Sequence, residues 1–401
     1  MNSLVQSHSH SHSRSQSQSQ PQPQPQPQAL VQAATLAPSS HNMQPWLFRF
    51  EGPVIELLAD RTRALPVNDP DDRELTISCG SALFNLRVAA AAAGLDAKVV
   101  LLPGAADMDL MARVHLATSA AGQPDAELSA AMAERRTTRE RFAPTAVDPK
   151  ALRSLVDAVQ NEGATLAVLA TDDQRLGAAA LVAEGDAVQW ANPSWRRELA
   201  AWMHLRRRGD GLTLPTLAIP VAQMVVRTFD MGEGVAAKDR QLADESPVLA
   251  VLSTEGDGPR DWLVAGQALQ RLLLVGMRLG LQASYLNQPV QVAALRPKLQ
   301  QLSGRPGYAQ LLLRIGTPTK TLPAAPRRAV RWRTCCSRHH ERTKGRPSHV
   351  DCRGSLAHPG SDSSGRLAGL EPGNAEAISR RRRPAARRQH LREDSGQHQR
   401  G

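Results

Sequence analysis

The stretch "GSALFNLRVAAAAAGL", residues 80–95, recurs later in the chain as "GQALQRLLLVGMRLGL", residues 266–281. Both copies follow the pattern G-x-A-L-x-x-L-x7-G-L, and a proline stands eight residues beyond each of them, at Pro103 and Pro289. Each single identity is weak evidence, because Gly, Ala and Leu are common, but identical spacing over the whole stretch indicates a repeated structural unit. We therefore predict two related halves.

Each copy predicts a long apolar helix that ends at a glycine and leads into a strand, "AKVVLLP" in the first copy and "QASYLNQP" in the second. A short apolar strand precedes each helix, "PVIELLA" at residues 53–59 and "SPVLAVLST" at residues 246–254. Helices that are apolar on all sides are buried, so we expect these two to pack against each other. The sequence thus predicts an α+β fold in which tandem halves form a single-chain pseudo-dimer.

Both ends of the chain differ in composition from this middle region. Residues 1–28 are low-complexity repeats of Ser, His, Gln and Pro, and residues 331–401 are rich in Arg, Ser, Gly and Pro with one aromatic residue, Trp332. Such segments bury too little apolar surface to offset the entropy of ordering, so we predict that both are disordered. The N-terminal half is then placed at residues 29–133 and the C-terminal half at residues 134–330.

The basic character of the chain belongs to its C-terminal tail. Residues 331–401 hold 16 Lys and Arg against 7 Asp and Glu, so +9 of the formal net charge of +11 lies there and +2 remains for the rest. A basic tail can bind nucleic acid through counterion release. Its abrupt start is also typical of a gene read out of frame, and we favour that interpretation over a nucleic-acid partner.

Cysteine usage and hydropathy indicate a cytoplasmic protein. Three of the four cysteines lie in the tail without the spacing of a zinc site, so we predict no metal site, and Cys79 alone remains in the predicted fold, as in a reducing compartment. No apolar run in the sequence has the length of a membrane span, and no secretory signal is evident. We predict a soluble protein that does not interact with membranes.

Two polar segments are candidates for ligand binding. "APSSHNMQPW", residues 37–46, offers hydroxyls and amides without a charge, whereas "ERRTTRERF", residues 134–142, and "PRRAV", residues 326–330, offer arginines. A planar ring with a phosphate at its far end requires both kinds of surface, because Arg donors match phosphate oxygens in pairs. The alternative for the arginine run is a solvated helix end, the usual place of such charges.

The first polar segment, extended to "APSSHNMQPWLF", resembles the A-P-S-x-x-N-x-Q-P-W-x-F signature of the FMN-binding nitroreductase family. "RRTTRERF" is similar to that family's R-R-S-x-R-x-F, with one extra residue before Phe142. Ordinary members carry both motifs in one subunit, arginines first, whereas here the order is reversed and each motif lies in a different half. This arrangement resembles the Acg-type branch, with two fused nitroreductase-like halves and one flavin site, and the resemblance covers about 300 of the 401 residues.

The resemblance implies a set of cofactor-binding residues. Those implied for the FMN phosphate are Arg135, Arg136, Thr137 and Arg139, with Arg327 and Arg328 nearby. Those implied for the isoalloxazine are Pro38, Ser39, Ser40 and Asn42, with Gln44 supporting their loop. Those implied beside the reactive flavin N5 are Asn287, Gln288 and Pro289. Lys238 or Arg240 is a candidate for the cation beside flavin N1, although both also suit an exposed helix surface.

The implied activity is NAD(P)H-dependent reduction of a nitroaromatic, quinone or similar small-molecule electron acceptor, by a monomeric pseudo-dimer or a homodimer. No catalytic side chain is implied, because the flavin carries the chemistry. Residues 185–234 have no counterpart in the first half and are a candidate lid, with Trp195, Leu199 and Trp202 on one apolar face. A non-catalytic flavin-binding or flavin-storage protein with an occluded site is the alternative.

Two further patterns are not interpreted as sites. "GEGVAA", residues 232–237, satisfies G-x-G-x-x-A but lacks the preceding strand of a dinucleotide-binding unit. Ser40 and His41 are adjacent in the chain, so their side chains are not expected to act as nucleophile and base, and we predict that His41 is an ordinary loop residue.

Overall fold

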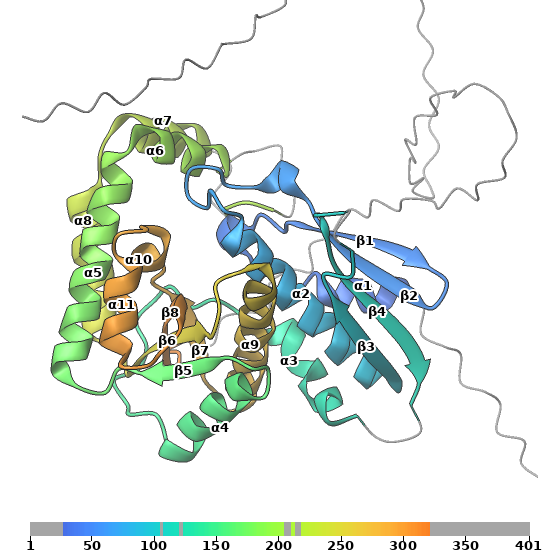
Figure 1. Cartoon of the computed structure of the whole chain (residues 1–401). Coiled ribbons are helices and arrows are strands. Elements are labelled where there is room, and N and C mark those ends of the chain that lie inside the picture. Colours follow the sequence, from blue (N-terminus) through green and yellow to red (C-terminus); the bar gives the residue numbers. More distant parts are fainter. Residues whose placement is uncertain (1–26, 105–106, 120–122, 204–209, 213–217, 321–401) are drawn as a thin grey trace, which may run out of the picture. The chain divides into compact units, whose positions relative to one another are not determined.

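Two long helices run through the middle of the molecule, and each packs against a four-stranded sheet (Figure 1). The computed structural model describes residues 27–104, 107–119, 123–203, 210–212 and 218–320. The predicted disorder of residues 331–401, and of nearly all of residues 1–28, lies outside the described residues, as do Arg327 and Arg328. Pro27 and Gln28, which we predicted to be disordered, instead form the first turn of a helix.

The two sheets have the same strand order, and every strand pair is antiparallel. The first sheet runs, in spatial order, β1 (Trp46–Glu51), β2 (Val54–Ala59), β4 (Leu110–Thr118) and β3 (Leu95–Leu101). The second runs β5 (Thr165–Val168), β6 (Val248–Thr254), β8 (Tyr308–Gly316) and β7 (Gln282–Tyr285). The strands predicted before and after each repeat helix are confirmed as β2 and β3, and as β6 and β7.

The repeat helices α2 (Arg73–Ala92) and α9 (Pro259–Arg278) pack against each other, as predicted. They cross at the first glycine of each copy: a Cβ atom on Gly80 would lie 2.3 Å from the Leu263 carbonyl oxygen, and one on Gly266 would lie 2.0 Å from the Ile77 carbonyl oxygen. A side chain at either position would hold the backbones apart. The repeated glycine is therefore a contact between the halves.

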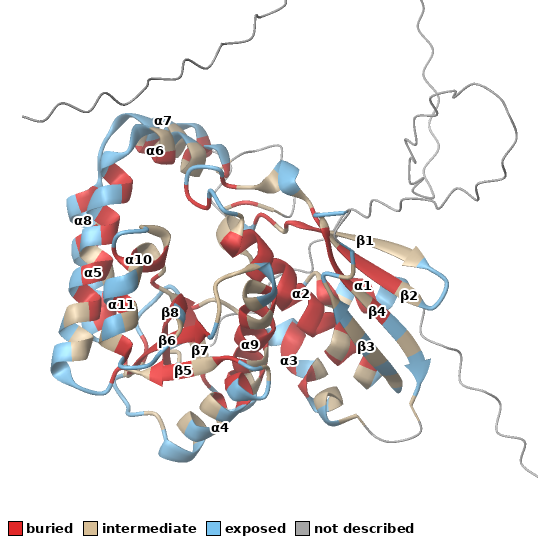
Figure 2. Cartoon of the chain, viewed as in Figure 1, coloured by how far each residue is buried: buried red, intermediate tan, exposed pale blue. Residues whose placement is uncertain are grey.

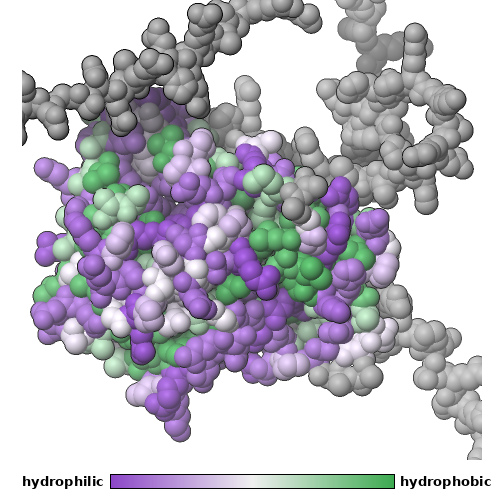
Figure 3. All heavy atoms as spheres, in the orientation of Figure 1, coloured by the Kyte–Doolittle hydropathy of each residue, from purple (hydrophilic) through white to green (hydrophobic). Residues whose placement is uncertain are grey.

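Burial explains the unusual apolarity of α2 (Figure 2). Among the described residues, α2 is long and apolar enough to cross a membrane, but 89% of its most apolar window is buried inside the molecule. The helix packs between the first sheet and α9, as the core helix of a folded domain does. Hydrophilic residues predominate on the face shown in Figure 3, and apolar residues form smaller patches there.

The second half carries an insertion that the first half lacks. A two-residue turn joins β1 to β2, whereas the described part of the segment between β5 and β6 contains four helices. These are α5 (Asp172–Ala191), α6 (Pro193–Ala201), α7 (Ile219–Thr228) and α8 (Gly232–Asp244). The candidate lid at residues 185–234 lies inside this insertion.

The remaining helices are shorter and complete the two halves. They are α1 (Pro27–Ala34), α3 (Ser129–Glu134), α4 (Pro149–Gln160), α10 (Gln288–Gln291) and α11 (Arg296–Ser303), with 3-10 turns η1 (Ser40–Asn42), η2 (Arg61–Arg63) and η3 (Pro124–Leu128). The loop containing η1 and the loop after α3 hold the two polar segments that the sequence singled out.

Candidate functional site

The loop that contains η1 has an unusual backbone. His41, Asn42 and Gln44 have φ values of 48°, 54° and 49°, in the left-handed region that residues other than glycine rarely adopt. Two hydroxyls hold it: Ser39 Oγ accepts from the Gln44 backbone N–H at 3.0 Å, and Ser40 Oγ donates to Glu74 Oε2 at 2.6 Å. Strain of this kind persists where surrounding structure enforces it, and it concentrates at functional sites.

The arginine loop follows α3 and is fastened to the second sheet. The Thr138 backbone N–H donates to the Ala283 carbonyl of β7 at 3.2 Å. Arg314, on β8, donates to the carbonyl oxygens of Thr138 at 2.7 Å and Glu140 at 2.9 Å, and its guanidinium lies 4.7 Å from the ring centre of Phe142. Arg314 is only 1% exposed, so a buried cation fixes the backbone of this loop.

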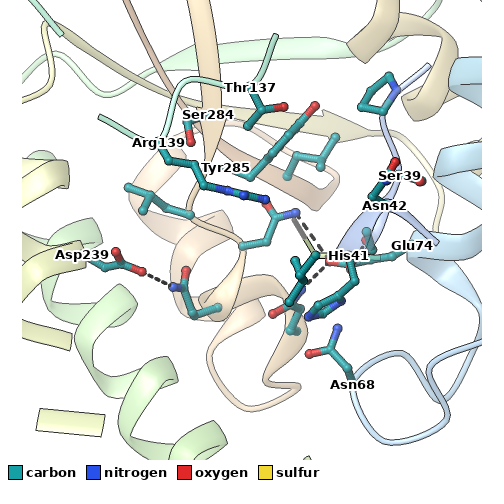
Figure 4. Close-up of a pocket in the computed structure, with 18 of the residues that line it drawn as sticks. Ser39, His41, Asn42, Asn68, Glu74, Thr137, Arg139, Asp239, Ser284 and Tyr285 are labelled. Carbon is teal, nitrogen blue, oxygen red and sulfur yellow. Dashed lines mark hydrogen bonds between the residues drawn. The ribbon is translucent and has the colours of Figure 1, made fainter. Parts of the chain in front are cut away.

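Both loops open onto one cavity of about 680 Å³, with walls from both halves (Figure 4). The predicted residues that line it are Pro38, Ser39, Ser40, Asn42, Arg135, Arg136, Thr137, Arg139, Asn287 and Gln288. Gln44 is not among the lining residues, whereas its backbone supports the loop through Ser39. Of the two candidate cations on α8, Lys238 lines the cavity and Arg240 does not.

Some donor atoms of the arginines at the cavity lack partners. The Nε and Nη1 atoms of Arg135 and the Nε atom of Arg136 are shielded from solvent and have no hydrogen-bond partner among the described residues. Burial lowers the pKa of Arg135, and the neighbouring Arg136 lowers it further, against the opposing effect of Tyr285. No described carboxylate forms an ion pair with Arg135, Arg136 or Arg139. A doubly charged phosphate would supply the missing acceptors.

Glu74, which sequence reasoning missed, connects the two halves at the cavity. This carboxylate, on α2, is 3% exposed and accepts from Ser40 Oγ at 2.6 Å and from Gln291 Nε2 at 2.9 Å. Asn287 Nδ2 approaches its Oε1 atom at 3.5 Å. In the sequence, Glu74 is one of several acids at the start of a helix, so only its burial between the halves distinguishes it.

His41 lies in a loop, as predicted, but it also lines the cavity beside Glu74 (Figure 4). Burial lowers its pKa; Glu74 raises it and Arg139 lowers it. The imidazole is therefore neutral near pH 7. Its Nδ1 atom is buried and has no hydrogen-bond partner among the described residues, so it is free to meet a bound molecule.

The inserted helices form another wall of the cavity and contact the first half. Trp195 Nε1, on α6, donates to Asn68 Oδ1 at 2.8 Å, and the Glu198 carboxylate accepts from the backbone N–H groups of Val67 and Asn68, both at 2.9 Å. Asn42 Nδ2 donates to the Gly211 carbonyl at 3.3 Å. The residues that line the cavity from the insertion include Asp186, Gln189, Trp190, Trp195, Leu199, Val235 and Asp239.

Comparisons with known proteins agree with this architecture. No family model matches the chain. The chain is 31% identical over 306 residues to the "Putative NAD(P)H nitroreductase Rv3131" of Mycobacterium tuberculosis, covering 74% of this chain and 87% of that protein. It is also 31% identical over 308 residues to the "Putative NAD(P)H nitroreductase acg" of the same organism, covering 75% and 92%.

A more distant relative and a solved structure carry similar names. The "Probable NAD(P)H nitroreductase PigM" of a Serratia strain is 23% identical over 323 residues. The FMN and NADPH-dependent nitroreductase NfnB from "sphigopyxis sp. strain HMH" aligns with a TM-score of 0.34 at 19% identity, covering 50% of this chain and 94% of that one. The identity of 31% with Rv3131 and Acg extends over most of each chain. This chain therefore belongs to the nitroreductase family, in its Acg-type branch.

Proposed function

We propose that this protein is an FMN-dependent oxidoreductase that uses NAD(P)H to reduce a nitroaromatic, a quinone or a similar small-molecule acceptor. The observation that carries the proposal is the composition of the cavity: arginines with unpaired donor atoms in one loop face neutral hydroxyls and amides from another, across the boundary between the halves. The relatives named NAD(P)H nitroreductases support the same activity.

The residues fit the cofactor in charge and in size. Arg135 and Arg136 offer unpaired donor atoms to a phosphate, and Arg139 lines the same cavity. The neutral side chains of Ser39 and Asn287 suit the edge of a ring. A volume of about 680 Å³ lies within the range of cofactor sites. Bound FMN supplies hydride transfer, and NAD(P)H is the source of the hydride.

The protein's own part is binding, orientation and exclusion of water. Glu74 holds the Ser40 hydroxyl and the Gln291 amide in place, so both sides of the ring site keep a fixed geometry. Trp190 and Trp195 meet edge to face with ring centres 5.4 Å apart and present an apolar surface to the cavity. Apolar surface at this wall limits the access of water to the reacting atoms.

A second function is favoured by one observation. The insertion is tied to the first half by Glu198 and by the contact of Asn42 with Gly211, and its helices cover one wall of the cavity. A flavin-holding protein that admits no substrate is the alternative.

We further propose that residues 29–133 and 134–330 are the two halves and that residues 185–234 are a lid. We also propose that the protein is cytoplasmic and works as a monomer or a homodimer.

Anaerobic reduction of the purified protein tests the activity. We expect yellow protein that NADPH or NADH bleaches and that menadione or nitrofurazone reoxidises. Bound flavin that bleaches only with dithionite would support the flavin-holding alternative. Colourless protein that does not take up added FMN would contradict both functions.

The site is tested by comparing FMN with riboflavin, which lacks the phosphate. Arg135→Ala should raise the Kd for FMN about tenfold or more and leave the Kd for riboflavin nearly unchanged, because a charge-assisted contact to phosphate is lost. Arg141→Ala is the matched control, since Arg141 lies in the same loop but pairs with Glu245 and does not line the cavity. Equal losses for both flavins would argue against a phosphate at these arginines.

A further inference from the structure

Two carboxylates of the insertion share one amide donor at the cavity wall. Gln288 Nε2 donates to Asp186 Oδ1 at 3.2 Å and to Asp239 Oδ2 at 2.7 Å, the second contact being drawn in Figure 4. Asp186 lies on α5 and Asp239 on α8, and both line the cavity. Gly185 permits this approach, because a Cβ atom there would lie 2.7 Å from Gln288 Cβ.

No described cation forms an ion pair with this pair of carboxylates. Lys238, next to Asp239 on α8, is exposed, and Arg314 on β8 donates to carbonyl oxygens of the arginine loop. On α11, which also packs against α5, Lys298 pairs with Glu184. Two carboxylates that accept from a single nitrogen lie close together, and their repulsion disfavours ionisation of both.

Burial acts in the same direction. It raises the pKa of Asp186 to about 7, with a further rise from Asp239 and an opposing effect of the Gln288 amide. Burial also raises the pKa of Asp239, against the Gln288 amide, Lys238 and Arg314. Burial and the shared amide donor thus both favour a proton held by the pair at a higher pH than an ordinary aspartate would hold it.

One oxygen of the pair is available to a ligand. Asp186 is 2% exposed, and its Oδ2 atom is buried without a hydrogen-bond partner among the described residues. A buried polar atom without a partner is costly, and it is retained where a bound molecule completes it. The residue borders the cavity beside Gln288, which belongs to the predicted cofactor set.

We propose that Asp186 and Asp239 form a proton-holding carboxyl pair, and that Oδ2 of Asp186 delivers the proton to an oxygen of the acceptor. The proposal rests on the proposed function, which supplies the hydride. In quinone reduction, the nicotinamide is oxidised, and its hydride provides the electron pair and one hydrogen. The O–H bond of Asp186 breaks as an O–H bond to the quinone oxygen forms, which completes the hydroquinone. Asp186 is left as a carboxylate and regains a proton from solvent that enters the cavity.

The carboxyl pair can be tested without flavin. Infrared spectra of the flavin-free protein at pH 7 should contain the C=O stretching band of a protonated carboxyl group, and Asp186→Asn and Asp239→Asn should each change it. Glu184→Gln, at an exposed position on the same helix, should leave it in place. A wild-type protein without the band, or a band that neither aspartate variant alters, would overturn the proposal.

Proton delivery is tested by comparing two acceptors of the FMN-loaded protein. Menadione takes up protons with its electrons, whereas ferricyanide takes up electrons alone. Asp186→Asn should lower the ratio of menadione to ferricyanide rates at least tenfold, as expected for loss of a general acid, and Asp239→Asn should shift the pH profile of the menadione rate. An unchanged ratio in Asp186→Asn would overturn delivery by this residue.

Failure of the proposed function would look different. In that case the wild type would bind no FMN or would accept no hydride, and the rates with both acceptors would be absent together. Proton delivery would then fail with it, while the infrared band of the flavin-free protein would still decide whether the carboxyl pair exists.

Discussion

Gly80 and Gly266 occupy the same position in the two copies of the repeat and meet where α2 and α9 cross. Their role is steric, since the Cα atom of Gly266 and a Cβ atom built on Gly80 would be 3.0 Å apart. Both glycines lie inside helices, where alanine is otherwise preferred by about 1 kcal/mol. Glycine stands at this position in both copies although it disfavours a helix, and the close contact between the two helices explains why.

Replacing either glycine should destabilise the protein. Gly80→Ala or Gly266→Ala should lower the free energy of unfolding by roughly 2–4 kcal/mol, because the new methyl group meets backbone atoms that side-chain repacking does not move. Denaturant unfolding measures the change. Gly276→Ala is the control on α9, as the nearest atom there lies at 3.5 Å. Equal stability of the crossing and control variants would contradict the close approach.

Asp186 predicts a pH dependence of stability. Its pKa is raised by burial to about 7 in the folded protein, so between the ordinary value near 4 and pH 7 the folded state holds a proton that the unfolded chain releases. Its contribution to stability is therefore present below about pH 4, is lost as the pH rises through about 7, and does not change further above that.

Substitution should remove this dependence. Asp186→Asn should be more stable than the wild type by about 1–3 kcal/mol at pH 8, with a difference that shrinks toward pH 4, in paired urea unfolding experiments at the two pH values. Glu184→Gln should follow the wild-type profile, since Glu184 is exposed on the same helix. A constant difference between Asp186→Asn and the wild type at all pH values would show that Asp186 ionises normally.

Among the elements, α6 decides how the insertion meets the first half. Its Glu198 accepts from two successive backbone N–H groups, and its Trp195 reaches Asn68, so one turn of helix holds the loop beneath it. Neighbouring residues of the insertion line the cavity. The inserted helices thus line the candidate site, although the first half has no equivalent of them.

Loosening this contact should speed the exchange of cofactor. Glu198→Ala should raise the dissociation rate of FMN by about tenfold, because two backbone donors lose their acceptor and α6 is released from the loop. The rate is measured by adding an excess of apoflavodoxin, which traps the FMN that the protein releases. Arg197→Ala is the control, because Arg197 is an exposed residue of α6 that donates to Ser194 on the same helix. If both variants release FMN at the wild-type rate, α6 is not a barrier to the cofactor.

At the scale of the whole molecule, the candidate site is lined by residues from both of the segments that carry the repeated strand order. The same strand order occurs twice, but the loop with neutral amides belongs to one half and the arginine loop is fastened to the sheet of the other. One half therefore supplies neutral amides to the cavity, and the other supplies arginines. This division explains why the two copies of the repeat diverge outside their shared spacing.

Truncation tests which C-terminal residues belong to this unit. A chain ending at residue 330 should keep the FMN affinity and thermal stability of the full chain, and it should lose any salt-sensitive binding to DNA, because +9 of the net charge of +11 is removed. A chain ending at residue 325, which also lacks Arg327 and Arg328, should bind FMN several-fold more weakly. Equal affinity of the two truncated chains would refute a role of this arginine pair.

Sequence alone determined the strands around each repeat helix, the packing of the two helices and the family, whereas the bounds of the two halves stay a prediction. These features depend on spacing within short segments, which a single chain displays directly. The two loops were recognisable because proline, amide and arginine stand at fixed intervals.

Only the tertiary structure decided which isolated residues join the site. Glu74, Asp186, Asp239 and Arg314 come from four different elements, and each resembles an ordinary helix or strand residue in its own segment. Burial between elements removes water from them and places them beside partners more than a hundred residues away in some cases, such as Gln291 for Glu74. The spacing of residues along the sequence does not show this loss of water. The chemistry of these four side chains therefore follows from the packing of the halves.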